Sequence, residues 1–334
     1  MRILVTGGAG FIGTNLVRSL LEQGHEVIVL DNLITGHVKN VLPFIANPRF
    51  TFIEKDIINP FVSAKNEILT VDQIYHLACP TGVNNLGSLA EEMLLTCAIG
   101  TKNVLELAKV HKTRFLFTSS SEVYGDPEVS PQKEEYTGNV DPTGFRSPYE
   151  EGKRFAESLI ISYVRKYNLD ATIVRVFNTY GPQMSPKDTR VIPRLLRLAL
   201  TKKPLTIHGK GLQRRTFCYV DDFVKGLILV MGKGKKGQVY NLGSESEFSI
   251  IELAQIILEM TKTKSTFKFT KRPAHDHQMR LPALEKIKKL GWRPKTSLKE
   301  GLKKTINLQT ESASLVHKDS MGKKEEKWQQ YPAF

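Results

Sequence analysis

A tyrosine and a lysine placed four positions apart could together move a proton. Tyr149 and Lys153 flank the tripeptide Glu-Glu-Gly, and residues four apart on a helix share one face. An ammonium group beside a phenol lowers the phenol's pKa from about 10, which would let a phenolate act as a general base. Upstream, Thr118-Ser119-Ser120-Ser121 supplies hydroxyl groups at the end of an expected strand. We therefore predict that Tyr149 and Lys153 form a proton-transfer pair near this strand end.

A glycine turn near the N-terminus could hold a dinucleotide. Gly7, Gly10 and Gly13 form a GxxGxxG pattern between an expected strand and an expected helix. Gly7 and Gly10 would let the backbone approach a pyrophosphate, and Gly13 would let the helix pack on the strand. The helix N-terminus would offer its unpaired N–H groups to the anion. This context favours a nucleotide site over an ordinary tight turn.

The type of dinucleotide follows from an acidic residue after the second strand. Asp31 lies eighteen residues after Gly13, where a carboxylate can accept both hydroxyls of an adenosine ribose and would repel a 2′-phosphate. NAD is therefore expected rather than NADP. Asp56, at the end of the third strand, is interpreted as a contact to the adenine ring, with an exposed loop aspartate as the alternative. The full set of expected cofactor-binding residues is Gly7, Gly10, Phe11, Ile12, Gly13, Asp31, Asn32, Asp56, Ile57, Leu77, Ala78, Tyr149 and Lys153.

Hydrophobic periodicity indicates the elements that would position these residues. Short apolar runs at 1–6, 26–30, 49–54, 73–77, 113–119 and 171–177 are typical of buried parallel strands, and amphipathic helices are expected at 11–22, 86–111 and 147–167. This alternation predicts an α/β fold, a Rossmann-like doubly wound parallel sheet with a smaller, partly interwoven substrate lobe. The expected NAD-binding domain covers 1–178 with a contribution from about 219–242, the substrate lobe covers 179–310, and 311–334 form a loose tail.

Composition excludes several classes of protein. The chain has 334 residues, of which 40% are hydrophobic and 25% charged, which predicts a soluble globular protein. No apolar run approaches the roughly 20 residues that span a bilayer, and no leader precedes the first strand, so we expect a cytoplasmic protein. Cys79, Cys97 and Cys218 lie far apart in the sequence, which indicates neither a disulfide framework nor a metal site; they are interpreted as buried small side chains. The net charge of +14 is spread out, which favours a solvated basic surface over a nucleic-acid or membrane interface.

Segments between Met1 and about residue 308 resemble a known enzyme family. The resemblance is carried by LVTGGAGFIG, DQIYHLACP, TSSSEVYGDP, RSPYEEGKR, RVFNTYGP, FCYVDD, VYNLGS and LGWRP. These segments are similar to the extended short-chain dehydrogenase/reductase family, and within it to UDP-glucuronate decarboxylases. Ser121-Glu122 occupies the place where 4,6-dehydratases carry an Asp-Glu pair. The chain departs from the decarboxylases over Thr81–Asn85, and at Leu95 and Cys97, where they carry Lys and Asn.

The resemblance implies an NAD-dependent lyase that converts UDP-glucuronate into UDP-xylose through a 4-keto sugar. Tyr149, with Lys153 and Ser120, would take the proton from the sugar O4, and the resulting β-keto acid would lose CO2 while NAD is recycled. Glu122 and Ser121 would order water or assist proton transfer at C5. Arg215, rather than its neighbour Arg214, matches an arginine that faces the sugar carboxylate. Contacts to the nucleotide diphosphate are implied for Asn178, Arg190 and Arg280.

Other interpretations stay open at the level of sequence. A nucleotide-sugar 4-epimerase or 4,6-dehydratase shares most of the same segments, and a dinucleotide sensor without catalysis would share the fold. A nucleic-acid binder is disfavoured because the sequence contains no basic recognition helix or aromatic RNA motif. The partners expected are a nucleotide sugar and a second copy of the chain, since the helices at 86–111 and 147–167 resemble those that form a homodimer in this family.

Overall fold

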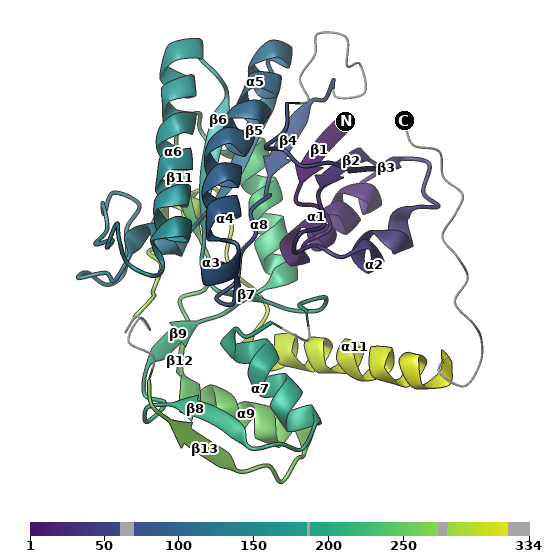
Figure 1. Cartoon of the computed structure of the whole chain (residues 1–334), viewed down its shortest axis with the longest axis vertical. Coiled ribbons are helices and arrows are strands. Elements are labelled where there is room, and N and C mark those ends of the chain that lie inside the picture. Colours follow the sequence, from purple (N-terminus) through teal and green to yellow (C-terminus); the bar gives the residue numbers. More distant parts are fainter. Residues whose placement is uncertain (61–69, 186–187, 273–278, 320–334) are drawn as a thin grey trace.

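A seven-stranded parallel sheet organises the larger lobe. The computed structural model describes residues 1–60, 70–185, 188–272 and 279–319, with side chains described up to residue 308 (Figure 1). The strands occur in the order β11-β6-β5-β4-β1-β2-β3 and all pair in parallel, which confirms the predicted doubly wound fold. Their bounds are β1 Arg2–Thr6, β2 Glu26–Asp31, β3 Phe50–Glu54, β4 Gln73–His76, β5 Arg114–Ser120, β6 Ala171–Val176 and β11 Val239–Leu242.

Helices cover both faces of this sheet because successive strand residues point to opposite sides. In β1, Ile3 and Val5 join one hydrophobic cluster, which contains residues of α1 (Phe11–Glu22) and α8 (Val220–Lys233). Leu4 joins the other cluster, which contains residues of α5 (Thr101–His111) and α6 (Ser147–Tyr167). Short turns of helix, α2 (Val38–Val41) and η1 (Leu42–Phe44), lie between β2 and β3. Both faces of the sheet are therefore buried, as an all-parallel sheet requires.

The strand order reverses between β1 and β4. In doubly wound sheets a ligand binds outside the carboxyl ends of the strands at such a point. The Gly7 turn follows β1, and the segment Leu77–Cys79 follows β4. The topology thus places both segments at the same crevice.

A second lobe lies beyond the carboxyl edge of the sheet (Figure 1). It contains a parallel pair, β8 (Leu205–His208) with β13 (Phe267–Thr270), and an antiparallel pair, β9 (Arg214–Thr216) with β12 (Glu247–Ser249). Between the lobes, β7 (Thr179–Tyr180) pairs with β10 (Cys218–Tyr219). The chain re-enters the sheet through α8 and β11, so the lobes are interwoven. The helices of this part are α7 Val191–Leu200, α9 Ile250–Thr261, α10 Glu285–Lys289 and α11 Leu298–Asp319.

The helix expected over 86–111 is present, but it is interrupted at Leu89 and contains a π-helical turn. The structure divides this stretch into α3 (Asn85–Ser88), α4 (Ala90–Leu95), a π-helical turn η3 (Thr96–Gly100) and α5. Leu89 leaves helical geometry between the first two pieces, after Gly87 and Ser88, which are weak helix formers. Gly100 packs closely against Ile57, because a Cβ built on it would lie 2.8 Å from the Ile57 side chain.

The C-terminal tail also differs from the expectation. Residues 311–319, predicted to be loose, continue α11 as helix. Elongation of an existing helix costs little, and 309–319 contain no glycine or proline. Residues 320–334, the rest of the predicted tail, lie outside the described part of the chain. Within the described part, none of the helices is long and apolar enough to cross a membrane.

Candidate functional site

The glycine turn after β1 is built for close backbone approach. Gly7 has a positive φ of 73°, and a Cβ built on it would lie 2.7 Å from the backbone nitrogen of Ala78. A Cβ on Gly13 would lie 2.2 Å from the Gly7 carbonyl oxygen, so only glycine lets α1 begin this close to the turn. Gly10 is the N-cap of α1, and within the described residues no side chain caps this end and no acidic residue occupies the first turn. The N–H groups there suit an anion.

A buried carboxylate lies next to this turn. Asp31 is 8% exposed and accepts hydrogen bonds from the backbone N–H groups of Ala9 at 2.9 Å and Leu33 at 2.8 Å. Burial raises the pKa of Asp31, and these two hydrogen bonds oppose the rise. Each carboxylate oxygen keeps a second lone pair, so the group can still accept from a ribose.

The remaining predicted cofactor residues gather at the ends of neighbouring strands. The Asn32 amide donates to the Asp56 carboxylate at 2.8 Å, which orients both side chains after β2 and β3. Ile57 is buried and packs on Gly100. Leu77 and Ala78 continue β4, with Ala78 N–H 3.3 Å from the Thr6 hydroxyl. Phe11 and Ile12 are partly buried at the start of α1.

The predicted proton-transfer pair lies on α6 facing the end of β5. Lys153 is 2% exposed, and its Nζ donates to the Thr118 carbonyl at 2.9 Å and lies 6.0 Å from the centre of the Tyr149 ring. Ser120, buried at the last position of β5, hydrogen-bonds to Tyr149. The structure therefore brings the Tyr149–Lys153 pair, selected by spacing, together with Ser120, whose role the family resemblance implied.

The acidity of the phenol differs from the sequence expectation. Desolvation raises the pKa of Tyr149 to about 12, although the Lys153 charge and the Ser120 hydrogen bond lower it. Lys153 lowers the pKa of Tyr149, as predicted. The expected net pKa below about 10 is wrong for the protein without its cofactor, because burial raises the pKa of Tyr149 by more than Lys153 lowers it. Lys153 stays charged: burial lowers its pKa, but neighbouring anionic groups, Cys79 first, raise it above the ordinary value.

One buried histidine in this region was not singled out by the sequence. His76, the last residue of β4, bonds to the Thr6 hydroxyl at 2.7 Å and the Thr101 hydroxyl at 3.0 Å. Burial, and then the charge of Lys153, lower the pKa of His76 to about 3. His76 is therefore neutral and ties β4 to β1 and α5 beneath Lys153. Its signal in the sequence is weak because one histidine in an apolar strand is usually a core residue.

A charged cluster follows β5. Ser121 and Glu122 begin η4 (Ser121–Tyr124). Arg280, 4% exposed, donates to the Ser121 hydroxyl at 3.2 Å and to the Gly125 carbonyl at 2.8 Å. Its Nη2 lies 3.5 Å from the Glu122 carboxylate, which also pairs with Arg146 at 2.5 Å. The Nε of Arg280 is buried and has no hydrogen-bond partner among the described residues.

The surroundings of three arginines, Arg146, Arg280 and Arg215, can be compared with the sequence predictions. Sequence reasoning missed Arg146, whose only signal is its position just before α6. The family resemblance assigned Arg280 to the nucleotide diphosphate, and that role stays a prediction; the described contacts of Arg280 are with Ser121, Gly125 and Glu122. Arg215 lies on β9, where its Nη1 donates to the Arg214 carbonyl at 2.8 Å.

The other predicted substrate residues lie between the lobes and in the second lobe. The Asn178 amide donates to the Thr216 carbonyl at 3.3 Å, which ties the end of β6 to β9. Arg190 precedes α7 and forms an ion pair with Asp188, and its side chain is 41% exposed. A charge that is paired and exposed in this way is typical of a surface side chain, and the diphosphate contact implied for Arg190 stays a prediction.

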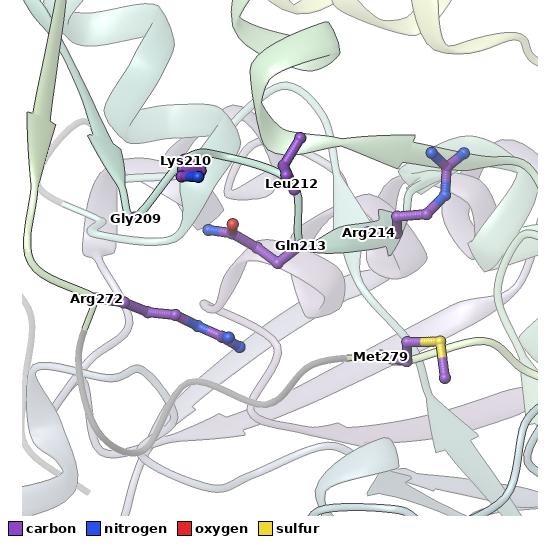
Figure 2. A pocket seen from close by; sticks show the side chains of 7 residues that line it. All are labelled: Gly209, Lys210, Leu212, Gln213, Arg214, Arg272 and Met279. Carbon is purple, nitrogen blue, oxygen red and sulfur yellow. The ribbon is translucent and has the colours of Figure 1, made fainter.

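A cationic hollow of about 340 Å³ opens in the second lobe. Figure 2 shows Arg272 extending from the loop after β13 into the space below Gln213. The hollow suits an anionic group because three of its lining residues carry positive charge. The lining residues are Gly209, Lys210, Leu212, Gln213, Arg214, Arg272 and Met279.

The fold and site define a dinucleotide-dependent enzyme of the doubly wound class, with a tyrosine–lysine pair on α6 that faces the end of β5. The chain belongs to the NAD dependent epimerase/dehydratase family, whose model matches residues 3–243. It is 44% identical to UDP-glucuronic acid decarboxylase 1 of Arabidopsis thaliana, over 92% of this chain and 69% of that protein. It is 43% identical to UDP-glucuronic acid decarboxylase 1 of Xenopus tropicalis, over 92% of this chain and 71% of that protein.

Solved structures agree with this family. The dTDP-glucose 4,6-dehydratase DesIV of Streptomyces venezuelae, solved with NAD bound, superposes with a TM-score of 0.84 at 31% identity, over 94% of this chain and 98% of that one. NAD is the cofactor of this family, as the sequence predicted. The glycine turn, the open start of α1 and the buried Asp31 fit that cofactor.

Proposed function

We propose that this protein decarboxylates UDP-glucuronate to UDP-xylose and regenerates its NAD within each turnover. The observation that carries the proposal is the arrangement at the end of β5, where Ser120, Tyr149 and Lys153 lie beside the Ser121–Glu122–Arg280 cluster. The first group suits oxidation of a sugar hydroxyl, and the second offers a buried cation for a carboxylate. The similarity to UDP-glucuronic acid decarboxylases over nine-tenths of the chain supports the same substrate.

Tyr149 takes the proton from the sugar O4 in this mechanism. The glycine turn and Asp31 would hold NAD, which would supply a reversible hydride acceptor for C4 and a positive charge that favours the phenolate. Ser120 holds the same sugar oxygen by a hydrogen bond. Lys153, fixed on the Thr118 carbonyl, stabilises the phenolate.

The charged cluster acts at C5. Oxidation at C4 makes the sugar a β-keto acid, which loses CO2 readily because the electrons of the breaking bond move into the C4 carbonyl. Arg280, whose Nε is buried and unpartnered among the described residues, would hold the carboxylate before this step. Glu122 and Ser121 would order the water that protonates C5. The sequence prediction that Arg215 faces the carboxylate stays a prediction, and the cationic hollow beside β9 supports a role for that lobe at the diphosphate.

A homodimer in the cytoplasm completes the proposal. Large apolar side chains are exposed along the helices that resemble the dimer helices of the family, which is typical of a surface covered by a partner. Light scattering should give twice the monomer mass. These side chains are Leu94, Ile99, Val110, Phe155 and Tyr167, each between 41% and 52% exposed.

The decisive experiment is incubation of the purified protein with NAD and UDP-glucuronate, followed by NMR and mass spectrometry of the sugar. Release of CO2 with a UDP-pentose is expected. An unchanged mass with inverted C4 would instead make the protein an epimerase, and reaction only with dTDP-glucose would make it a dehydratase. Tyr149→Phe should abolish turnover while NAD still binds.

Variants of the two arginines separate their roles. Arg280→Leu should remove decarboxylation but leave oxidation at C4 detectable as bound NADH absorbance. Arg215→Leu should raise the KM for the nucleotide sugar with a smaller effect on kcat. Equal loss of CO2 release and of C4 oxidation in Arg280→Leu would contradict the carboxylate role.

A further inference from the structure

Two cysteines that are distant in the sequence meet beside the candidate site. Cys79 Sγ and Cys97 Sγ lie 3.7 Å apart, and the predicted burial is confirmed for Cys97 and Cys218 but not for Cys79, which is partly exposed. A disulfide bond has a length of about 2.05 Å, so each sulfur needs to move by less than about 1 Å. Cys218, the third cysteine, is buried and its thiol donates to the Tyr219 carbonyl.

The two cysteines lie between the dinucleotide turn and the helix that carries Tyr149 and Lys153. Cys79 follows Ala78, whose backbone packs against Gly7 in the dinucleotide turn. Cys97 lies in the π-helical turn η3, and a Cβ built on Gly152 of α6 would lie 3.3 Å from the Cys97 Cβ. Gly152 directly precedes Lys153. The two cysteines thus connect the cofactor turn to the helix that carries the proton-transfer pair.

The two thiols are chemically different. Cys79 is partly exposed, whereas Cys97 is buried. The hydrogen bond with Cys97 lowers the pKa of Cys79 to about 7 against the effect of burial, and the Lys153 charge lowers it further. The same hydrogen bond and burial raise the pKa of Cys97. Because the thiolate is the form that reacts with oxidants, Cys79 is the attacking thiol and Cys97 the resolving one.

We propose that Cys79 and Cys97 form a reversible disulfide when a peroxide oxidises the protein, and that this bond switches the neighbouring site off. The Cys79 thiolate attacks one oxygen of hydrogen peroxide, the O–O bond breaks, and protonation of the leaving oxygen yields a sulfenic acid and water. The Cys97 sulfur then displaces the sulfenic hydroxyl, which leaves as a second water with the Cys97 proton. Two thiols are oxidised by two electrons, one peroxide is reduced, and an added dithiol reverses the change.

Loss of function follows from the geometry. Drawing Cys79 toward Cys97 shifts the segment that packs on Gly7, and it removes the thiolate that faces Lys153. Displacement by about 1 Å in an active site can reduce a rate by up to about a hundredfold. We expect the oxidised protein to bind NAD at least about tenfold more weakly and to lose turnover accordingly. The effect on turnover rests on the proposed function, whereas the disulfide and the NAD affinity do not.

The test treats the purified full-length protein with hydrogen peroxide, blocks free thiols with iodoacetamide and maps the peptides by mass spectrometry. No lysine or arginine lies between residues 66 and 101, so trypsin leaves both cysteines in one peptide, and cleavage after Glu91 or Glu92 is needed to separate them. Two linked peptides, lighter by two hydrogens and separated by dithiothreitol, are expected. Calorimetry then measures NAD affinity before oxidation, after it and after reduction.

Matched variants make the outcome specific. Cys218→Ser should form the link and lose NAD affinity as the wild type does. Cys97→Ser should form no link, and Cys79 should instead proceed to sulfinic acid, which dithiothreitol does not reverse. Cys97→Ala serves the same purpose if the serine disturbs packing. Absence of the linked peptides in the oxidised wild type would overturn the proposal, and a link that leaves NAD affinity unchanged would overturn the switch.

Discussion

Lys153 lies close enough to Tyr149 for its charge to stabilise the phenolate. Its Nζ lies 6.0 Å from the centre of the Tyr149 ring, and it is 2% exposed. At an effective dielectric constant of about 20, unit charges at this distance interact by about 2.8 kcal/mol. Since about 1.36 kcal/mol corresponds to a factor of ten, replacing Lys153 with methionine should reduce the phenolate population about a hundredfold.

The assay is kcat/KM as a function of pH with saturating NAD. Lys153→Met should lose about a hundredfold near pH 7, and the rise of its rate with pH should be displaced by about two pH units to higher pH than in the wild type. The matched control is Lys166→Met on the same helix, because Lys166 also lies over a tyrosine ring, at 5.1 Å from the centre of Tyr167, but is exposed. Its activity should stay within about twofold of wild type.

The reasoning fails if Lys153→Met, folded by circular dichroism and still binding NAD, retains kcat/KM within about threefold of wild type. A large loss with an unchanged pH profile would also refute it, because Lys153 would then act through position rather than through the phenol's pKa.

Three other predictions concern the glycine turn, the Asp31 carboxylate and a buried ion pair. Gly13→Ala should destabilise the protein by about 1–3 kcal/mol in urea unfolding and weaken NAD binding, because its Cβ would lie 2.2 Å from the Gly7 oxygen; unchanged stability would contradict this. Burial raises the pKa of Asp31, so the ribose-accepting carboxylate is lost as pH falls through that raised value. Calorimetry from about pH 7 to about pH 4 should show a falling NAD affinity in the wild type and a weak, flat one in Asp31→Asn. Arg175→Met leaves the Glu157 carboxylate, 12% exposed, without its bidentate partner and should lower the free energy of unfolding by about 3–5 kcal/mol. Adding Glu157→Leu should recover part of that stability. No recovery would show that other contacts of Arg175 dominate.

The doubly wound fold and the NAD site could be predicted because local sequence carries them. Short apolar runs such as Ile3–Val5 and the glycines at 7, 10 and 13 describe constraints within one βα unit. The reaction type was predicted from resemblance, through short segments such as Ser121-Glu122. Neither local sequence patterns nor family resemblance shows which side chains far apart in the sequence are in contact.

Local sequence was enough to predict the alternation of strands and helices, the glycine turn with Asp31, and the placement of Tyr149 and Lys153 on one helix face. These follow from backbone sterics and from the periods of strand and helix, which act over a few residues. Three features could be seen only in the folded chain: Arg280 contacts Ser121, Cys79 contacts Cys97, and burial raises the pKa of Tyr149 by more than Lys153 lowers it. Contact and desolvation depend on what packs around a group, and that is set by segments many residues apart in the chain.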